Sequence, residues 1–217
     1  MNKVNYKILV TGGAGMIGSN LVKKLVDLGF EVFVADNLWR GKTEYLLSEN
    51  SKMVIPNENF FHVDLRDYEN CLKVTKNIDI VIHLADVVAG INYVFSNESS
   101  LYRSNILINT HTLNASIANK VKKFIYAGTA CSYPKSRQSK INPPPFKEED
   151  VFPAEPESSY GWSKLMGEYE AELAFKAGLI DIEILRLHNV YGSPSELDPS
   201  FSQVIPALCR KTIEQKN

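Results

Sequence analysis

The chain has few cysteines, no excess of charge of either sign and no long apolar run. Its 217 residues include three cysteines, 24 basic residues and 25 acidic residues, and its formal net charge is -1. An odd number of widely separated cysteines predicts reduced thiols rather than a disulfide framework, which indicates a cytoplasmic protein. The balanced charge gives no support to nucleic-acid binding, because such proteins usually carry a basic excess.

Apolar runs in this sequence are too short to span a bilayer, so we expect no membrane association. The N-terminal stretch MNKVNYKILVTGG enters a strand pattern directly and lacks the apolar stretch and cleavage site of a signal peptide. The cysteines and histidines show no spacing typical of metal ligands, so we expect no metal. A hydrophobic content of 44% is typical of a soluble globular domain.

Short β-rich runs alternate with longer helical patterns. The runs are Tyr6–Val10, Glu31–Ala35, Asn59–Val63, Asp79–Leu84, Lys123–Ala127 and Asp181–Leu187. The helical patterns are Met16–Leu28, Ser99–Asn119 and Ser158–Ala177. Alternating strands and helices predict right-handed crossovers and a parallel sheet. We therefore expect one α/β domain over residues 1–217, a Rossmann-like doubly wound parallel sheet. Two of the runs, IVIHLA and FIYA, are apolar on both faces, which is typical of strands covered by helices on both sides.

Pro134–Pro156 is the one long irregular segment, and it holds six of the ten prolines. Proline density predicts neither helix nor central strand there. The strand and helix pattern resumes afterwards without a change of composition. We therefore expect a loop folded over a site rather than a linker.

A glycine-rich turn follows the first strand in KILVTGGAGMIGSNL. Gly12 permits the tight turn, Gly15 lets the backbone approach a pyrophosphate, and Gly18 lets the helix pack on the strand. The next strand ends at Asp36, where an acid can bind the adenosine ribose hydroxyls. The whole pattern predicts a dinucleotide site and favours NAD over NADP, although Arg40 lies close enough to leave NADP open.

Tyr160 and Lys164 lie four residues apart in SSYGWSKLMGE. On a helix they share one face, one turn apart. A nearby ammonium favours the phenolate, so we expect Lys164 to lower the pKa of Tyr160 and make it an acid/base for a sugar hydroxyl.

These motifs resemble the extended short-chain dehydrogenase/reductases, and within them the NAD-dependent epimerase/dehydratase family. The shared stretches are TGGAGMIG, Asp36, HLAD, GTACSYP, YGWSK and LRLHNVYG, in that order. The resemblance implies a catalytic set of Thr129, Tyr160 and Lys164, with the last two also touching NAD. It further implies a cofactor groove that includes Met16, Ile17, Asn37, Asp64, Leu65, Leu84 and Ala85, and a sugar-nucleotide site that includes Asp86, Thr129, Asn189 and Gln203.

Cys131 distinguishes branches of this family. The related 4,6-dehydratases typically carry Glu at that position, and simple 4-epimerases a small or hydroxyl residue. A thiol in this context resembles the GDP-mannose 3,5-epimerases and GDP-fucose synthases, which remove a proton next to a keto group. The alternative for Cys131 is a buried small hydrophobe, the commonest role of a free cysteine.

Two features depart from that branch. Gln203 stands near the place of its second acid and cannot donate a proton in that sense; His188 is a substitute, or a hydrogen-bonded structural residue. The family's C-terminal substrate-closing region is also expected to be largely missing, because the sequence ends at Asn217.

Two hypotheses follow. The first is an NAD-dependent nucleotide-sugar epimerase acting through a transient 4-keto sugar, with a GDP-mannose-like substrate favoured and a 4-epimerase, 4-reductase or 4,6-dehydratase as alternatives. The second is a non-catalytic NAD-binding relative. The resemblance also implies a homodimer that pairs through Ser99–Asn119 and Ser158–Ala177.

Overall fold

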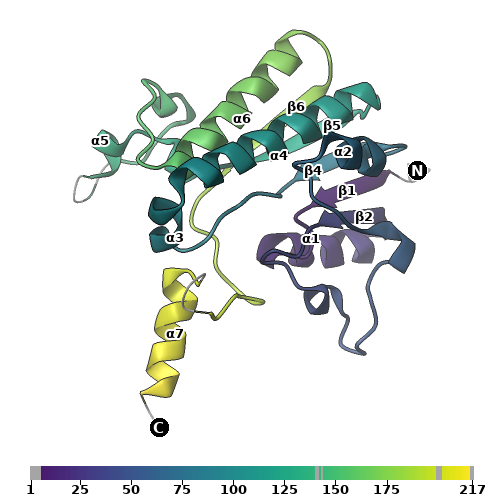
Figure 1. Cartoon of the computed structure of the whole chain (residues 1–217), viewed down its shortest axis with the longest axis horizontal. Coiled ribbons are helices and arrows are strands. Elements are labelled where there is room, and N and C mark those ends of the chain that lie inside the picture. Colours follow the sequence, from purple (N-terminus) through teal and green to yellow (C-terminus); the bar gives the residue numbers. More distant parts are fainter. Residues whose placement is uncertain (1–5, 140–141, 143, 199–201, 216–217) are drawn as a thin grey trace.

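The computed structural model describes residues 6–139, 142, 144–198 and 202–215 of the chain. Its centre is a six-stranded parallel sheet in the order β3-β2-β1-β4-β5-β6 (Figure 1). The strands are β1 (Lys7–Thr11), β2 (Glu31–Asp36), β3 (Phe60–His62), β4 (Ile80–His83), β5 (Lys123–Thr129) and β6 (Asp181–Leu187). Because the strands are parallel, all six carboxyl ends lie at one edge of the sheet.

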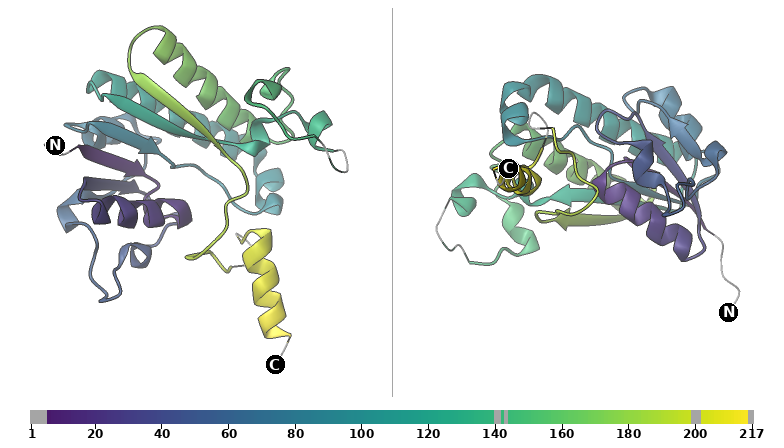
Figure 2. Two further views of the ribbon diagram at one scale, coloured as in Figure 1. Left: turned by 180° about the vertical axis from the view of Figure 1, so that it is seen from behind. Right: turned by 90° about the horizontal axis from the view of Figure 1, so that it is seen from below.

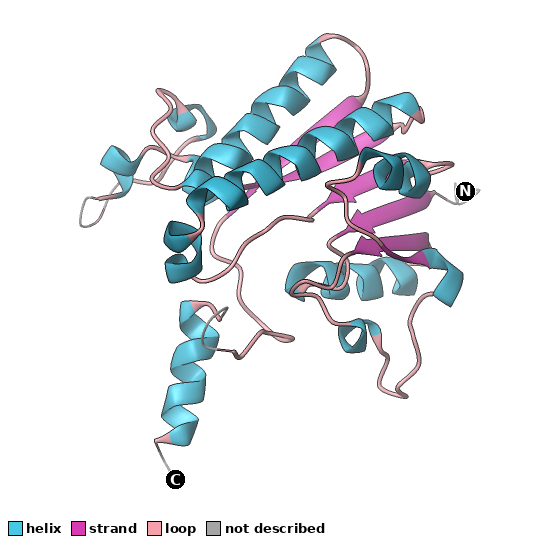
Figure 3. Ribbon diagram, in the orientation of Figure 1, coloured by secondary structure: helices cyan, strands magenta, loops and turns pink. Residues whose placement is uncertain are grey.

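Helices cover both faces of the sheet. The helices within the described ranges are α1 (Met16–Asp27), α2 (Tyr68–Thr75), α3 (Ile91–Ser96), α4 (Glu98–Ala118), α5 (Lys135–Gln138), α6 (Ser159–Lys176) and α7 (Val204–Glu214). Short 3₁₀ turns occupy Thr43–Leu46, Asn57–Asn59, Ala130–Ser132 and Glu148–Val151. One face packs against α1, and the other against α2, α4 and α6 (Figure 3). The predicted doubly wound, Rossmann-like fold is therefore confirmed.

The core is divided between these two faces. Leu9, Val81 and Phe124 point toward α2, α4 and α6, whereas Ile8 and Val10 point toward α1. This alternation follows from the two-residue period of a strand. The central strands are covered on both sides, as predicted, but the sheet edge is not: on β6, Leu185 is 50% exposed.

The three predicted helices have the expected bounds to within two residues. Helix α6 begins after Ser158, whose hydroxyl accepts a hydrogen bond from the amide of Gly161 at 3.2 Å, and it ends before Gly178, which has a φ of 68°. Both ends follow known capping preferences.

The prediction for Pro134–Pro156 was wrong in one part, because α5 and the turn Glu148–Val151 are helical. Prolines exclude helix only where the ring would replace a bonded amide or meet the preceding turn. Lys135–Gln138 contains no proline, and Pro134 precedes its first residue, so a single turn forms. This segment lies beside the carboxyl ends of β5 and β6, which is consistent with a loop near a site.

After β6 the chain crosses the carboxyl edge of the sheet and reaches α1. There the side-chain amide of Asn20 donates a hydrogen bond to the backbone carbonyl of Ser193 at 3.0 Å, and Lys42 forms an ion pair with Glu196 at 3.2 Å. Helix α7 then stands apart beyond the carboxyl ends of the strands (Figure 2), and none of its described residues is buried. No helix within the described ranges is long and apolar enough to cross a membrane.

Candidate active site

The glycine turn after β1 is built for close backbone contact. Gly12 has a φ of 69°, and a Cβ added to it would lie 2.9 Å from the amide nitrogen of Ala85. A Cβ on Gly18 would collide with the carbonyl oxygen of Gly12 and lie 2.7 Å from the Cα of Gly13. The first helix therefore packs directly on the turn, and the roles predicted for both glycines have a structural basis.

The first turn of α1 has backbone donors that the helix itself does not satisfy. The helix begins at Met16, so the amides of Met16, Ile17 and Gly18 have no carbonyl one turn earlier. Its N-cap, Gly15, supplies no side-chain bond, and the first turn contains no acidic residue. An uncapped positive helix end with glycines beside it is suited to a pyrophosphate.

Asp36 lies at the carboxyl end of β2, beside this turn. Its carboxylate accepts hydrogen bonds from the amides of Ala14 at 3.0 Å and Leu38 at 2.8 Å. Burial raises the pKa of Asp36, and these two bonds oppose that rise. A carboxylate has four acceptor sites, so the oriented oxygens can still accept from ribose hydroxyls. The nearby Arg40 donates to the carbonyl of Val88 across the groove.

The other residues expected around the cofactor gather at the same sheet edge. Asn37 directly follows β2, and its side chain hydrogen-bonds Asp64 just after β3. Asp64 also pairs with Arg66 at 2.6 Å. The amides of Leu84 and Ala85, just after β4, each donate to the hydroxyl of Thr11 at 3.2 Å. Leu65 is buried in the core between the sheet and α2.

A second group of residues lies at the end of β5. Thr129 is the last residue of that strand, and its hydroxyl accepts from the amide of Cys131 at 3.2 Å. The Cys131 thiol is exposed. The following residue, Ser132, is fully buried and donates to the carboxylate of Glu168 on α6 at 3.3 Å. This hydrogen bond joins the turn Ala130–Ser132, which contains Cys131, to α6, the helix that carries Tyr160.

Tyr160 and Lys164 lie on one face of α6, as predicted. The Tyr160 phenol hydrogen-bonds the Thr129 hydroxyl at the end of β5. The ammonium of Lys164 lies 4.5 Å from the ring centroid of Tyr126. The pair of Thr129 and Tyr160 is suited to proton transfer at the end of a central strand.

The prediction that Lys164 lowers the pKa of Tyr160 was wrong for the chain without cofactor. Burial raises the pKa of Tyr160 well above its usual value, and Asp86 and Cys131 raise it further, against a smaller opposing effect of Thr129. The ammonium of Lys164 is instead held by Asp86, at 3.2 Å. Spacing on one helix predicted that Lys164 lies near the phenol but not that a carboxylate balances its charge.

Asp86 itself lies beneath the groove surface rather than on it. Its side chain and that of Lys164 are each 4% exposed. Its neighbour His83 is fully buried between Thr11 and Asn109, whose oxygens lie 2.8 Å from Nδ1 and 3.0 Å from Nε2. Burial lowers the pKa of His83 to about 3, so the imidazole is neutral and structural.

The remaining candidates lie further along the chain. Asn189 and His188 follow β6 and are exposed, as is Gln203 at the N-cap of α7. The His188 ring centroid lies 6.3 Å from that of Tyr133. The assignment of Asn189 and Gln203 to the sugar-nucleotide site, and of His188 as a substitute acid, remains a prediction.

Comparison with known proteins then gives the family. The family model described as "NAD dependent epimerase/dehydratase family" matches residues 8–217. The chain belongs to this family. Its cofactor is therefore NAD, and the glycine turn, the uncapped start of α1 and Asp36 fit that cofactor. The groups that would hold it are Gly12, Gly15, Met16, Ile17 and Asp36.

Individual members of the epimerase/dehydratase family give the likeness in more detail. The chain is 35% identical to the GDP-mannose 3,5-epimerase of Arabidopsis thaliana over 207 residues, 95% of this chain and 53% of that protein. It superposes on a UDP-N-acetylglucosamine 4-epimerase from Methanobrevibacter ruminantium with a TM-score of 0.81 and 28% identity, covering 97% of this chain and 64% of the other.

A third family member was solved with its cofactor. The NAD complex of UDP-glucose 4-epimerase from Thermus thermophilus matches with a TM-score of 0.74 and 30% identity, over 88% of this chain and 57% of the other. The chain thus spans about half the length of the curated GDP-mannose epimerases it matches. These relatives are nucleotide-sugar enzymes. The sequence is similar both to members named for GDP-sugars and to members named for UDP-sugars.

Proposed function

We propose that this protein is an NAD-dependent nucleotide-sugar epimerase acting through a transient 4-keto sugar, with GDP-mannose or a close analogue as substrate. One observation carries the proposal: an exposed thiol, Cys131, stands two residues after Thr129, whose hydroxyl hydrogen-bonds the Tyr160 phenol, at the carboxyl edge of the sheet. Identity of 35% to plant GDP-mannose 3,5-epimerases supports the choice of sugar nucleotide.

The residues divide the proton transfers between them. NAD, when bound, supplies hydride acceptance from C4 and its return, so that net redox change is zero. Tyr160 takes the proton of the C4 hydroxyl and later gives it back. Thr129 donates a hydrogen bond to the C4 oxygen and holds it beside the phenol. Asn189 and Gln203 complete the proposed sugar-nucleotide contacts from the segment after β6.

Cys131 removes the carbon-bound proton, which is the step that allows the configuration of the sugar to be inverted. A ketone at C4 acidifies the C–H bonds at C3 and C5, so a thiolate can remove one of those protons. The C–H electrons pass into an enolate, and the same carbon takes a proton from a water molecule on the other face; the hydroxide left behind is neutralised by the proton that Cys131 gained. The exposure of Cys131 suits this role, since a base must reach the sugar. The three free cysteines agree with the reducing conditions of a cytoplasm, where we place the enzyme.

Exchange of carbon-bound hydrogen tests this function. GDP-mannose incubated in heavy water with the protein and NAD is expected to gain deuterium at C3 or C5, detected by mass spectrometry and NMR. Cys131→Ala should lower that exchange by about 10²- to 10⁴-fold, the usual contribution of a positioned acid or base. Cys209→Ala, which removes the exposed thiol on α7, is the matched control and should exchange at the normal rate.

Two outcomes would contradict the proposal. If C4 is inverted with no exchange at C3 or C5, the protein is a 4-epimerase. The likeness to UDP-sugar 4-epimerase structures is the observation that favours this second candidate. If NAD binds but no GDP-, UDP- or dTDP-sugar is turned over, the chain is a non-catalytic relative.

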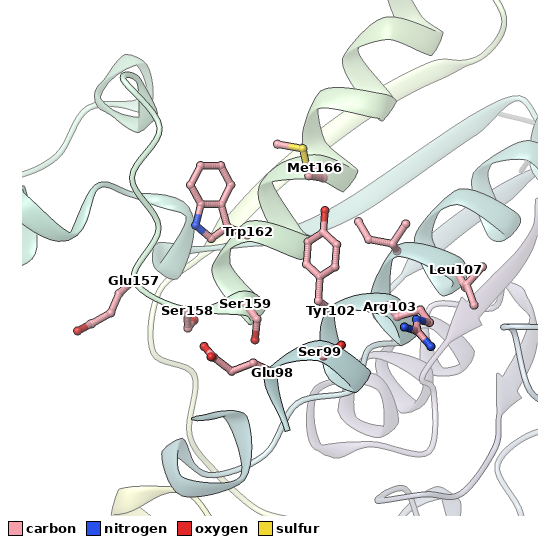
Figure 4. A pocket seen from close by; sticks show the side chains of 11 residues that line it. Glu98, Ser99, Tyr102, Arg103, Leu107, Glu157, Ser158, Ser159, Trp162 and Met166 are labelled. Carbon is pink, nitrogen blue, oxygen red and sulfur yellow. The ribbon is translucent and has the colours of Figure 1, made fainter. Parts of the chain in front are cut away.

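We also propose that two copies pair through α4 and α6. The two helices line an open groove of about 910 Å³ (Figure 4), with Tyr102 from α4 and Trp162 and Met166 from α6. Along the same helix, Tyr169 and Leu173 are also exposed, which leaves a large apolar area for a second subunit to cover.

Light scattering is expected to give twice the chain mass of 24.4 kDa. Trp162→Glu should yield a monomer, because a charge would be buried unpaired in the contact. Leu28→Glu, an exposed apolar residue at the end of α1, is the control and should leave the dimer intact. A monomeric parent protein at micromolar concentration would contradict this proposal.

A further inference from the structure

Glu168 on α6 is a buried carboxylate that the proposed proton transfers do not use. The residue is 1% exposed. Its Oε2 accepts a hydrogen bond from Nε of Arg186 on β6 at 2.8 Å. Its Oε1 accepts from the hydroxyl of Ser132, a fully buried residue, at 3.3 Å. A buried ion pair is costly to leave with a missing partner, so the carboxylate and the groups that bind it have fixed places.

The same carboxylate lies against the backbone of β5. A Cβ added to Gly128 would collide with Oε1 of Glu168, so only a glycine lets the carboxylate approach the strand this closely. Gly128 comes directly before Thr129, and Ser132 comes directly after Cys131. Oε1 therefore meets the chain on both sides of the two residues that the proposed function places at the sugar.

The Cys131 turn, Ala130–Ser132, meets α6 at a second point. A Cβ on Gly161 would collide with the carbonyl oxygen of Cys131. Gly161 follows Tyr160 directly and lies seven residues, about two helical turns, before Glu168. That spacing puts Gly161 and Glu168 on the same face of the helix. The turn therefore packs on α6 at two places, one beside the proposed acid/base and one at the buried carboxylate.

Arg186 extends the same network beyond the turn. Its Nη1 donates to the backbone carbonyl of Glu148 at 2.8 Å, and its guanidinium lies 5.8 Å from the ring centroid of Tyr133. The ion pair therefore holds two consecutive residues at the end of the Cys131 turn: Glu168 binds Ser132, and Arg186 faces Tyr133.

Thr129 and Cys131 are held in different ways. Thr129 is the last residue of β5, and it pairs with Leu187 of β6 in the sheet. Cys131 comes after this pairing has ended, in the turn that the Ser132 hydroxyl joins to Glu168. Loss of the bond between Ser132 and Glu168 should therefore move the thiol while leaving the backbone of Thr129 in place.

We propose that Glu168 is a positioning residue for Cys131. Held in place by Arg186, its carboxylate fixes the Cys131 turn on α6 through the Ser132 hydroxyl. The thiol is thereby kept at a set place relative to the Tyr160 phenol. The inference rests on the function proposed above, in which Tyr160 acts at C4 and Cys131 at a neighbouring carbon. Two groups that act on adjacent atoms of one ring need a fixed spacing, since a displacement of about 1 Å can cost about 10²-fold in rate.

Separate rates for the two chemical steps test the inference. Ser132→Ala removes the hydroxyl that binds Glu168 and leaves the ion pair with Arg186 in place. In a single turnover of GDP-mannose in heavy water, deuterium uptake at C3 or C5 reports the Cys131 step, and the absorbance of reduced NAD reports hydride removal from C4. Ser132→Ala should slow deuterium uptake by about 10- to 10²-fold, the scale of a small displacement. Hydride removal should stay within about twofold of the parent, whereas equal losses in both steps would overturn the inference.

Further variants make the outcome specific. Glu168→Asp withdraws the carboxylate by one methylene and should slow the same step; Ser132→Ala keeps the test open if Glu168→Asp does not fold. The double variant should lose no more than the larger single loss, because both changes break one bond, and losses that multiply would count against the inference. Ser116→Ala is the matched control. It removes another fully buried hydroxyl, which donates to the Thr112 carbonyl on α4 at 2.7 Å, and should leave both steps unchanged.

Backbone hydrogen exchange separates this inference from the proposed function. The amides of Cys131 and Tyr133 donate within the turn, to the Thr129 hydroxyl and the Ala130 carbonyl, each at 3.2 Å. In Ser132→Ala these amides should exchange about tenfold faster, the worth of one hydrogen bond, while α6 exchanges as in the parent. Unchanged exchange in the turn would overturn the inference. Faster exchange without turnover of any nucleotide sugar would support the anchoring of the turn and contradict only the proposed function.

Discussion

Replacing Tyr160 with Phe is expected to lower kcat for nucleotide-sugar turnover by about 10²- to 10⁴-fold, the usual contribution of a positioned general acid/base. The phenol is the group that faces the Thr129 hydroxyl at the end of β5, and Phe keeps the ring while removing the proton that is exchanged. The same change should lower the affinity for NAD by no more than about tenfold, the worth of one hydrogen bond.

The measurement pairs steady-state kinetics with calorimetric titration of NAD. Tyr169→Phe is the matched control, because that phenol is 50% exposed on the same helix. It should leave kcat within about twofold of the parent, as expected for a surface change. A Tyr160→Phe enzyme that turns over at a rate close to the parent would show that another group moves the C4 proton.

The second large effect is expected from Gly18→Ala, which should prevent tight NAD binding and destabilise the fold. The added methyl would meet the carbonyl oxygen of Gly12 and the Cα of Gly13, and both are backbone atoms that cannot turn aside. Helix α1 must then move off the turn, which costs about 1–3 kcal/mol as overpacking does. The same movement displaces the amides that would bind the pyrophosphate.

Urea unfolding and NAD titration measure the two parts of this prediction. Lys24→Ala, an exposed change on the same helix, is the control and should alter the free energy of unfolding by less than about 0.5 kcal/mol. Parent-like NAD affinity in Gly18→Ala would show that the turn adapts. The packing argument for that glycine would then be wrong.

Local patterns in the sequence were sufficient for much of the fold. Strand-like runs and helical spacing of apolar residues placed three helices and six strands within about two residues of their positions. The shorter α2 and α3 were not predicted. A six- to eight-residue helix has too few turns to show a clear apolar period, and it forms because the sheet and its neighbours pack against it.

The sequence predicted which residues form the candidate site but not how their charges are balanced. Helical spacing predicted that Tyr160 and Lys164 lie on one face of a helix, whereas the roles of Thr129 and Cys131 were assigned from the family resemblance. The charge balance was not identified, because the Asp86–Lys164 pair joins segments far apart in sequence and depends on how α6 packs beside the loop after β4. No local pattern predicts which carboxylate a buried ammonium will meet.

The amino-acid sequence by itself determined the parallel sheet, the dinucleotide turn and the residue types at the end of β5, since these depend on short-range periodicity, glycine geometry and spacing along one helix. Only the tertiary structure decided which charges face one another. Burial strengthens electrostatic interactions and disfavours charged groups, so a carboxylate brought to 3.2 Å from Lys164 changes the proton affinity of Tyr160 in a way that spacing alone cannot express.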